Sequence, residues 1–220
     1  MKIKLLKFTK NPEETCALAA RLCYSAINID EISRKLTKEK IKDLLERVIS
    51  SGHTSVLEHS SFTFAIEGVS RALLSQLTRH RIASFSVQSQ RYVQFKTGIE
   101  TVCPPSVSKN KKLLEKYSSF IKTAETLYAE FLAQNIPAED ARYILPNAAS
   151  TKIILTMNAR ELRHFFSLRC CNRAQWEIRE MAIAMLKLTK KEAPILFANA
   201  GPDCARGKCH EHNPCGKPWK

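Results

Sequence analysis

Residues 79–92 combine cations with uncharged hydrogen-bond donors, and these residue types could bind a phosphate group. Arg79, His80 and Arg81 are adjacent and Arg91 follows them, with serines and glutamines between and no acidic residue. The planar guanidinium of arginine matches two phosphate oxygens at once, and hydroxyl and amide groups add neutral donors. Three adjacent cations repel one another unless an anion neutralises them. We therefore predict that this segment binds the phosphates of a nucleotide.

A basic turn on the surface is the alternative interpretation of this segment. A surface turn would use lysine freely, whereas this segment contains none, and apolar side chains interrupt it. The preceding residues are expected to be helical, so that Gln76 and Arg79 share one helix face. Both features favour a partly buried site. The apolar side chains expected to be partly buried are Ile82, Phe85, Val87 and Tyr92.

A second polar group lies in residues 158–169, whose apolar positions follow a helical period. Arg160 and His164 are four residues apart and are expected to share a helix face. Arg163 is expected to point to solvent or toward the neighbouring glutamate. Arg169 falls at the end of this helix, where a positive charge also suits the helix dipole, so a purely structural role is its alternative.

The elements expected to position these residues form an α+β fold, in which long helices and a helical lobe accompany a small, mainly antiparallel sheet. Residues 52–59 are expected to form a polar loop that could belong to the site. An ordinary turn with a helix cap is the alternative interpretation of these residues. We expect one domain over residues 1–200 and a tail rich in Cys and His over residues 201–220. The expected strands are 2–8, 62–66 and 151–157, and the expected helices are 11–24, 37–51, 71–78, 108–134, 138–144, 159–169 and 174–192. Asn11 and Ser70 are expected to be the N-caps of the helices that follow them.

The composition limits the possible classes of protein. The chain has 220 residues, of which 44% are hydrophobic, and this is enough for one sizeable core. Its formal charge of +14 favours polyanionic partners such as nucleic acids or nucleotides. A module that binds nucleic acid would need exposed aromatic side chains for stacking. Because the arginines cluster with serine and glutamine instead, we expect no nucleic-acid partner.

The compartment follows from what the sequence lacks. No stretch reaches the roughly 18 apolar residues of a membrane span, and residues 1–7 lack the apolar core of a signal peptide. We therefore expect a cytoplasmic protein without a membrane partner, in which the eight cysteines are reduced. Cys16, Cys23 and Cys103 are expected to be ordinary buried residues.

The segment first described also carries a family resemblance. Arg79-His80-Arg81, Ser84, Ser89 and Arg91-Tyr92 have the spacing of the signature of the flavin-dependent thymidylate synthases. The chain resembles this family over essentially residues 1–200. Further pieces occur in family order, namely the loop 52–59, Ala141-Arg142, Leu145-Pro146, Asn158-Ala159-Arg160, Leu168-Arg169 and Ala174–Ile178.

The resemblance implies a methyltransferase of nucleotide biosynthesis that makes dTMP from dUMP. In this family 5,10-methylenetetrahydrofolate donates the carbon and NADPH reduces the bound FAD, within a homotetramer whose active sites lie at subunit interfaces. A related flavoprotein that has lost synthase activity is the alternative. The implied FAD-binding residues are Ser55, Glu58, Arg79, His80, Arg81, Val87, Asn158, Arg160 and His164. The implied dUMP-binding residues are Gln76, Arg79, Val87, Gln88, Ser89, Gln90, Arg91, Arg142 and Arg169.

Within these sets the resemblance gives Arg169 the catalytic role, as activator of the uracil ring. Because arginine stays protonated at neutral pH, its contribution must be electrostatic rather than proton transfer. Cys170 and Cys171 follow it but are not expected to act as nucleophiles, since the family needs none. Val87 stands where several members have a polar residue, and we expect it to weaken nucleotide or flavin affinity without abolishing turnover.

No metal is expected at the catalytic residues. The tail, however, offers a possible metal site. Three cysteines and two histidines lie between residues 204 and 215, and thiolate and imidazole are ligands of zinc. Their spacing lacks the C-x-x-C pair of common zinc sites, so an unstructured tail or redox-labile thiols are the alternative. The zinc candidates are Cys204, Cys209, His212 and Cys215.

Overall fold

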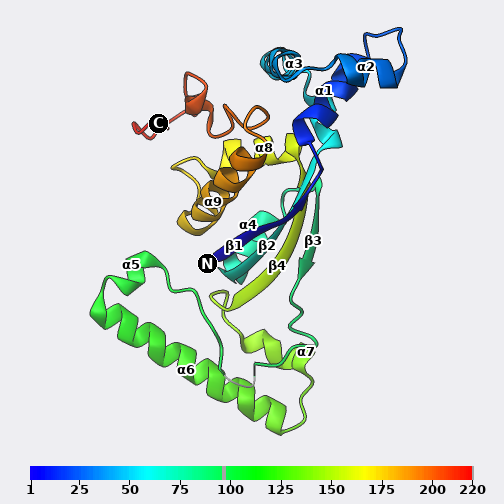
Figure 1. Ribbon diagram of the computed structural model, residues 1–220. Helices are drawn as coiled ribbons and strands as arrows, with labels where there is room; N and C mark the ends of the chain where they lie inside the picture. Colours follow the sequence, from blue (N-terminus) through cyan, green and yellow to red (C-terminus); the bar gives the residue numbers. More distant parts are fainter. Residues whose placement is uncertain (96–97, 220) are drawn as a thin grey trace. The chain divides into compact units, whose positions relative to one another are not determined.

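The computed structural model describes residues 1–95 and 98–219. Within them four strands form one antiparallel sheet in the order β1-β2-β4-β3 (Figure 1). The strands are β1 (Lys2–Phe8), β2 (Ser61–Ser70), β3 (Ala83–Val87) and β4 (Ser150–Asn158). The α-helices are α1 (Pro12–Leu22), α2 (Ile29–Lys35), α3 (Lys38–Ser50), α4 (Arg71–Leu77), α5 (Pro105–Ser108), α6 (Lys111–Ala133), α7 (Ala138–Ala141), α8 (Ala159–Arg169) and α9 (Trp176–Glu192). The 3-10 helices are η1 (Thr54–His59), η2 (Arg142–Ile144) and η3 (Asp203–Ala205).

The predicted α+β class is confirmed, because helices accompany a small antiparallel sheet. Among the described residues, four elements lie outside the predicted set, namely α2, η1, β3 and η3, and α5 meets the expected helix 108–134 only at its last residue. Helix α2 is too short for a clear apolar period, and the Asn28 side chain caps it by accepting from the Glu31 backbone N–H at 2.9 Å. Strand β3 alternates half-buried and exposed residues inside the polar segment 79–92, which hides its period. Expected helix 138–144 divides into α7 and η2.

The start of helix α1 differs from the expected N-cap. Asn11 precedes the helix as predicted, but its backbone is left-handed, with φ of 48°, and its side chain makes no cap hydrogen bond. The Asn11 amide instead donates to the Glu14 carboxylate at 2.9 Å. The Asn11 side chain, which we expected to cap the helix backbone, is therefore bonded to Glu14 in the first turn.

The chain forms two compact units, each made of several segments. The first comprises Met1–Lys2, Ile66–Arg79 and Ser86–Ile153, and the second comprises Ile3–Ala65, His80–Phe85 and Ile154–Lys220. A domain boundary at residue 200 stays a prediction, and the last residue of the expected tail, Lys220, lies outside the described residues.

The core of the second unit fixes helix α8, which carries much of the candidate site. The ring of Phe197 makes edge contacts with Phe62 of β2, at a centroid distance of 5.3 Å, and with Phe166 of α8, at 5.9 Å. The Ser60 carbonyl accepts from the Ala159 N–H at 2.7 Å at the start of α8. Helix α8 also packs against η1 and α9. Its register is therefore set by buried aromatic rings at one face.

The first unit positions the other predicted residues around helices α4 and α6. The Ser70 hydroxyl caps α4 as predicted, accepting from the Leu73 N–H at 3.0 Å. Helix α6 packs against α5, α7 and η2, with Tyr128 among its buried side chains. In the described part of the chain, we find no helix that is both long enough and apolar enough to span a bilayer.

Candidate active site

Helix α8 brings three polar side chains of the second unit to the site. Its first turn is capped by Asn158, whose side chain accepts from the Glu161 N–H at 2.8 Å. The helical period then places Glu161 and His164 on adjacent turns, and Arg169 is the last residue of the helix. Asn158, expected from the resemblance to bind flavin, therefore has a structural task as well.

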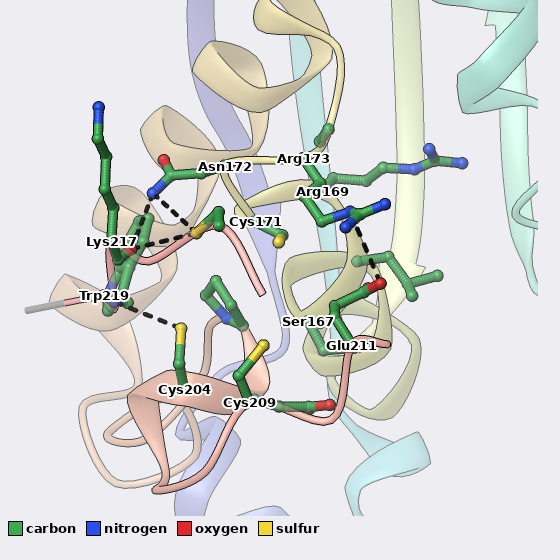
Figure 2. Close-up of a pocket in the computed structure, with 15 residues that line it drawn as sticks. Ser167, Arg169, Cys171, Asn172, Arg173, Cys204, Cys209, Glu211, Lys217 and Trp219 are labelled. Atoms are coloured by element: carbon green, nitrogen blue, oxygen red, sulfur yellow. Dashed lines mark hydrogen bonds and ion pairs between the residues drawn. The ribbon is translucent and has the colours of Figure 1, made fainter. Parts of the chain in front are cut away.

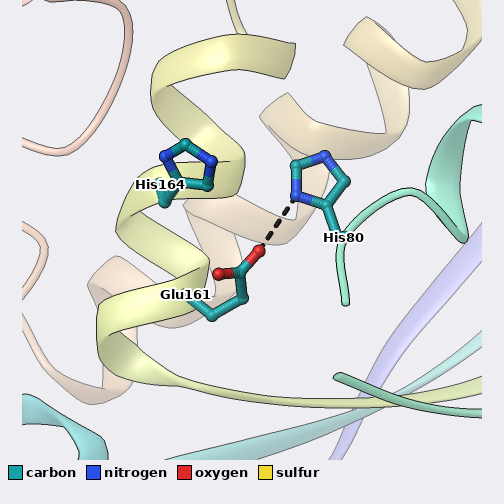
Figure 3. Close-up of side chains that lie close together, drawn as sticks. All are labelled: His80, Glu161 and His164. Atoms are coloured by element: carbon teal, nitrogen blue, oxygen red, sulfur yellow. Dashed lines mark hydrogen bonds and ion pairs between the residues drawn. The ribbon is translucent and has the colours of Figure 1, made fainter. Parts of the chain in front are cut away.

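A chain of two hydrogen bonds joins Glu161, His80 and Arg169, all within the second unit. His80 Nδ1 lies 3.0 Å from Glu161 Oε1, and Arg169 Nε donates to His80 Nε2 at 3.1 Å. Figure 3 shows His80 reaching from its loop toward Glu161 and His164 on α8. His80 is only 4% exposed and Glu161 8%. The edge contact of the imidazole with Phe165, at 4.9 Å, completes its enclosure.

The protonation state of His80 determines what this chain can do. Burial lowers the pKa of His80, the hydrogen bond to Glu161 opposes that effect, and the charge of Arg169 lowers the pKa further. A neutral imidazole has one N–H and one acceptor nitrogen. Because the carboxylate can only accept, the hydrogen belongs on Nδ1, and Nε2 is left to accept from Arg169. Glu161 thus fixes the tautomer that orients the guanidinium.

The remaining flavin candidates of the second unit surround this cluster at lower burial. Arg160 donates to Glu58 of η1 at 2.5 Å, and both side chains are about half exposed. The His164 ring meets the His80 ring edge-on at 6.0 Å. Ser55, Arg81 and His164 are exposed. Arg160 and His164, which were expected to share a helix face, are both exposed on α8.

His80, Glu161 and His164 also have the composition of a metal site. Their ligand atoms lie within 4.8 Å of one another. However, Glu161 already accepts from one ring nitrogen of His80, and the Arg169 guanidinium donates to the other. A guanidinium on the same imidazole opposes a second cation by Coulomb repulsion. The geometry therefore fits a hydrogen-bonded cluster better than a metal centre.

Two of the predicted dUMP residues of the first unit, Arg91 and Arg142, contact Glu139 of α7. Arg91 Nε donates to the Glu139 carboxylate at 2.8 Å, and Arg142 Nε donates to the Glu139 carbonyl at 3.0 Å. The Ser89 hydroxyl accepts from the Arg91 N–H at 3.1 Å. Burial, and next the charge of Arg142, lower the pKa of Arg71. Glu139 was not among the predicted site residues, because an acid in a first helix turn is common for dipole reasons alone.

The side chain of Gln90 has a donor, Nε2, that is shielded from solvent and from which no described residue accepts a hydrogen bond. The Gln88 N–H, in contrast, donates to the Lys152 carbonyl at 2.9 Å. Gln76 is half-buried and Arg79 is exposed, and the Arg79 N–H donates to the Gln76 carbonyl at 3.4 Å. An unsatisfied buried amide is costly, which makes Gln90 the best candidate here for a ligand contact.

Several expectations about burial are wrong. Ile82 is 67% exposed and Tyr92 78% exposed, whereas Phe85 and Val87 are half-buried as expected. Ile82 lies in the bend before β3, and the Arg91 guanidinium lies 5.4 Å from the centroid of the Tyr92 ring at the surface. Cys23 is exposed and Cys103 only half-buried, although Cys16 is buried as expected.

Arg163 does not point to solvent, as the sequence suggested. Its Nη1 donates to the Leu196 carbonyl at 2.5 Å, and burial lowers its pKa to about 10. This half-buried guanidinium holds the segment after α9 to α8 through the Leu196 carbonyl. Glu161 was not among the predicted site residues, because its contact with His80 appears only in the fold, where His80 reaches α8.

The two cysteines that follow Arg169 differ in their surroundings. Cys170 is completely buried, and burial raises its pKa to about 12. A thiol with so high a pKa is a poor nucleophile at neutral pH, in agreement with the expectation that Cys170 does not attack the substrate. Cys171 is half-buried and lines a separate cavity, which is considered below.

The second unit thus holds an arginine on a buried His–Glu pair, and the first unit holds two further arginines on Glu139. Guanidinium groups fixed in this way are suited to anionic substrates such as nucleotides. Comparison with known proteins specifies the family. Residues 4–195 match the family model of the thymidylate synthase complementing proteins. The chain is 54% identical to a flavin-dependent thymidylate synthase of Geobacter sulfurreducens, over 99% of this chain and 94% of that protein. Those of Clostridium tetani (46% identical, 99% and 94% covered) and Pyrococcus furiosus (43%, 97% and 91%) are also similar. The chain therefore belongs to the flavin-dependent thymidylate synthase family.

Proposed function

We propose that this chain, as a flavin-dependent thymidylate synthase, reductively methylates dUMP to dTMP with Arg169 as the group that activates the uracil ring. The observation that carries the proposal is the hydrogen-bond chain from Glu161 through His80 to Arg169. A guanidinium stabilises the negative charge that develops on a pyrimidine when its C5 carbon becomes nucleophilic. Stabilisation of this kind requires a fixed direction, and a buried imidazole acceptor on Nε restricts the guanidinium plane.

The residues around the hydrogen bonds from Glu161 through His80 to Arg169 fit a flavin dinucleotide. FAD carries a pyrophosphate, and exposed Arg81, Arg160 and His164 offer cationic or neutral donors, while Ser55 adds a hydroxyl. Arg160 is oriented by Glu58, which neutralises part of the charge before the cofactor binds. When bound, the flavin supplies hydride chemistry, with NADPH as its reductant and 5,10-methylenetetrahydrofolate as carbon donor. Asn158 and Arg79 complete the proposed flavin set.

The segment from Val87 to Arg91, with Gln76, Arg79 and Arg142, is proposed to bind dUMP. Arg91 and Arg142 supply cations for the nucleotide phosphate, and Glu139 holds both side chains through different oxygens. The buried amide nitrogen of Gln90 supplies a donor that no described residue satisfies. Phosphate and pyrimidine carbonyl oxygens are the acceptors that such donors need.

We further propose a cytoplasmic homotetramer in which these groups meet across subunit interfaces. Large apolar side chains near the nucleotide-binding residues support it, since Ile82, Tyr92 and Tyr143 are 67%, 78% and 83% exposed in the single chain. Burial of such side chains against another copy would favour association. A tetramer mass in solution and the loss of that mass in a Tyr92→Asp variant would support the assembly, whereas a monomeric active enzyme would contradict it.

The test of the function is release of tritium from dUMP labelled at C5, measured with NADPH and methylenetetrahydrofolate. We expect release that requires both co-substrates, together with flavin absorbance in the purified protein. Bound flavin without release would show a flavoprotein that has lost synthase activity. No flavin, combined with salt-dependent binding to single-stranded DNA, would favour a nucleic-acid-binding module instead.

A further inference from the structure

Four of the eight cysteines line one cavity of the second unit. Cys171 comes from the connection after α8, and Cys204, Cys209 and Cys215 come from residues 201–219. The cavity measures about 280 Å³. Figure 2 labels Cys171, Cys204 and Cys209 among the residues that line it, and Cys171 lies on a segment distant in sequence from the other two.

The ligand set that this cavity offers differs from the one expected from the sequence. His212 is not among the residues that line the cavity, and Cys171 takes its place. His210 is turned to another partner, since its Nδ1 lies 3.2 Å from Asp203 Oδ2. Spacing within the tail could not reveal Cys171, because it lies more than thirty residues earlier in the chain.

Two of the four sulfurs have hydrogen-bond donors nearby, although the Cys215 thiol itself donates to the Lys217 carbonyl at 3.5 Å, a bond that loss of the thiol proton would break. The Trp219 backbone N–H donates to Cys204 Sγ at 3.3 Å, and Asn172 Nδ2 contacts Cys215 Sγ at 3.9 Å. Hydrogen-bond donors aimed at sulfur are typical of the surroundings of metal thiolate centres. Arg173 and Lys217 also line the cavity and would offset negative charge.

The tail itself has little apolar material with which to hold its shape. The 3-10 helix η3 is its regular element within the described residues, and most side chains beyond residue 205 are exposed. Polar contacts to the connection after α8 hold it instead: Asn172 donates to the Lys217 carbonyl at 3.0 Å, and Arg173 donates to the Asn213 carbonyl. Small segments without a core are commonly stabilised by a metal or by disulfides.

We propose that Cys171, Cys204, Cys209 and Cys215 bind one Zn²⁺ ion in tetrahedral geometry. Binding converts four thiols to thiolates, releases four protons to the buffer and leaves a centre of charge −2 beside Arg173 and Lys217. Among the described residues, only His80, Glu161 and His164 have three ligand atoms within 4.8 Å of one another. Zinc–sulfur bonds of about 2.3 Å require the sulfurs to come closer than this, so the tail closes around the ion.

The site would tie the tail to the end of the helix that carries Arg169. Cys171 is two residues beyond Arg169, and both line the same cavity. Zinc would thus restrain the segment that follows the proposed catalytic group without touching the substrate. This role is structural, and its failure would leave the proposed synthase activity untouched as a hypothesis.

The test is zinc content of the full chain, purified under reducing conditions and measured by mass spectrometry for metals. We expect about one zinc ion per chain, protection of four thiols from a thiol reagent, and their release by a chelator. Replacement of zinc by Co²⁺ should give the strong visible absorption of tetrahedral cobalt thiolates. Cys171→Ser and Cys209→Ser should each lose most of the metal, whereas Cys23→Ser, an exposed cysteine outside the cavity, should keep it.

Three results would overturn the proposal. The first is reduced wild-type protein that holds no zinc even after incubation with Zn²⁺. The second is loss of zinc from His212→Ala with retention in Cys171→Ser, which would assign the ligand set differently. The third is stoichiometric iron in place of zinc. Far-UV circular dichroism and flavin content of each variant separate loss of metal from loss of the fold.

Discussion

The two groups of predicted site residues differ in how the protein holds its arginines. In the second unit, Arg169 donates to His80, a side chain only 4% exposed that is itself bonded to buried Glu161. In the first unit, Arg91 pairs with Glu139 at the surface, where both side chains are about half exposed. Buried hydrogen bonds are strong and costly to break, whereas exposed ion pairs contribute roughly 0–1 kcal/mol. The protein fixes the proposed catalytic group in advance and leaves the proposed phosphate-binding groups adjustable.

The largest expected effect tests the buried side of this comparison at Arg169. Lysine keeps the positive charge but cannot donate from Nε to His80 while directing a planar fork at the uracil. Arg169→Lys should lower kcat for tritium release at least ~100-fold, as loss of a preorganised electrostatic donor does in other enzymes. Arg34→Lys, on exposed helix α2, is the matched control and should retain activity. Full activity of Arg169→Lys would show that fork geometry is irrelevant.

Glu161 acts through His80 and is therefore expected to have a smaller effect. Glu161→Gln removes the charge and permits the other imidazole tautomer, in which Nε2 no longer accepts from Arg169. We expect a fall in kcat of about 10-fold with little change in KM for dUMP, which corresponds to about 1.4 kcal/mol in the barrier. Glu180→Gln, on the exposed face of α9, is the control. If kcat changed by the same factor in Glu161→Gln and Glu180→Gln, and the unfolding temperature by the same amount, the role of Glu161 would be merely structural.

The lowered pKa of His80 predicts a pH dependence of stability. Burial disfavours the protonated ring, so the unfolded chain binds more protons than the folded one below the ordinary histidine pKa of about 6.5. The free energy of unfolding should therefore be fully retained above that pH and fall as the pH drops toward the folded-state pKa. Urea denaturation at several pH values measures it.

Replacement of His80 should remove this part of the slope. We expect His80→Gln to be less sensitive to pH between neutral and mildly acidic conditions than the wild type. His210→Gln serves as the comparison, because the His210 side chain is 76% exposed and its loss should leave the slope as it was. A slope that persists in His80→Gln would mean that His80 is not the group that titrates.

The sequence predicted much of the fold and most of the candidate residues, and the exceptions have physical causes. Residues with a strong period or cap, such as Ser70 before α4 and the alternating β4, were recovered because local interactions determine them. Glu161, Glu139 and Cys171 were not assigned functions from the sequence, because each acts on a partner that is distant in the chain. Local patterns carry no signal for such pairs.

Burial predictions failed for a related reason. The sequence shows that Ile82 and Tyr92 are apolar but not whether another part of the same chain covers them, and in this chain they are exposed. The prediction that Arg163 points to solvent was wrong in the opposite sense, because the side chain is less exposed than expected. Only the fold brings it to the Leu196 carbonyl, whose hydrogen bond offsets the cost of partly burying a guanidinium. Residue type therefore predicted the chemistry of the site better than it predicted the solvent exposure.

The exposed side of the comparison is tested at Glu139. Glu139→Gln removes the ion pair with Arg91 but leaves the backbone carbonyl that accepts from Arg142. Because exposed pairs are weak, we expect KM for dUMP to rise no more than about 5-fold with kcat unchanged, and the difference to shrink at high salt. Glu130→Gln on exposed α6 is the control. A 100-fold loss of kcat would mean that both arginine groups are equally preorganised.

The smallest expected effect is at Val87, where a substitution should change ligand affinity but not kcat. It is half-buried at the end of β3, next to Gln88, whose N–H is already bonded to the Lys152 carbonyl. Backbone contacts at this position survive with any side chain, so only a side-chain contact is missing. Val87→Gln should tighten binding of dUMP or flavin by about 3-fold, the contribution of one half-exposed hydrogen bond, and leave kcat unchanged. Val87→Leu, which adds volume without a donor, should bind as the wild type does. Calorimetric titration with dUMP and with flavin measures both affinities. Unchanged affinities in Val87→Gln would show that the side chain at this position contacts neither ligand and that the proposed dUMP-binding segment begins at Gln88.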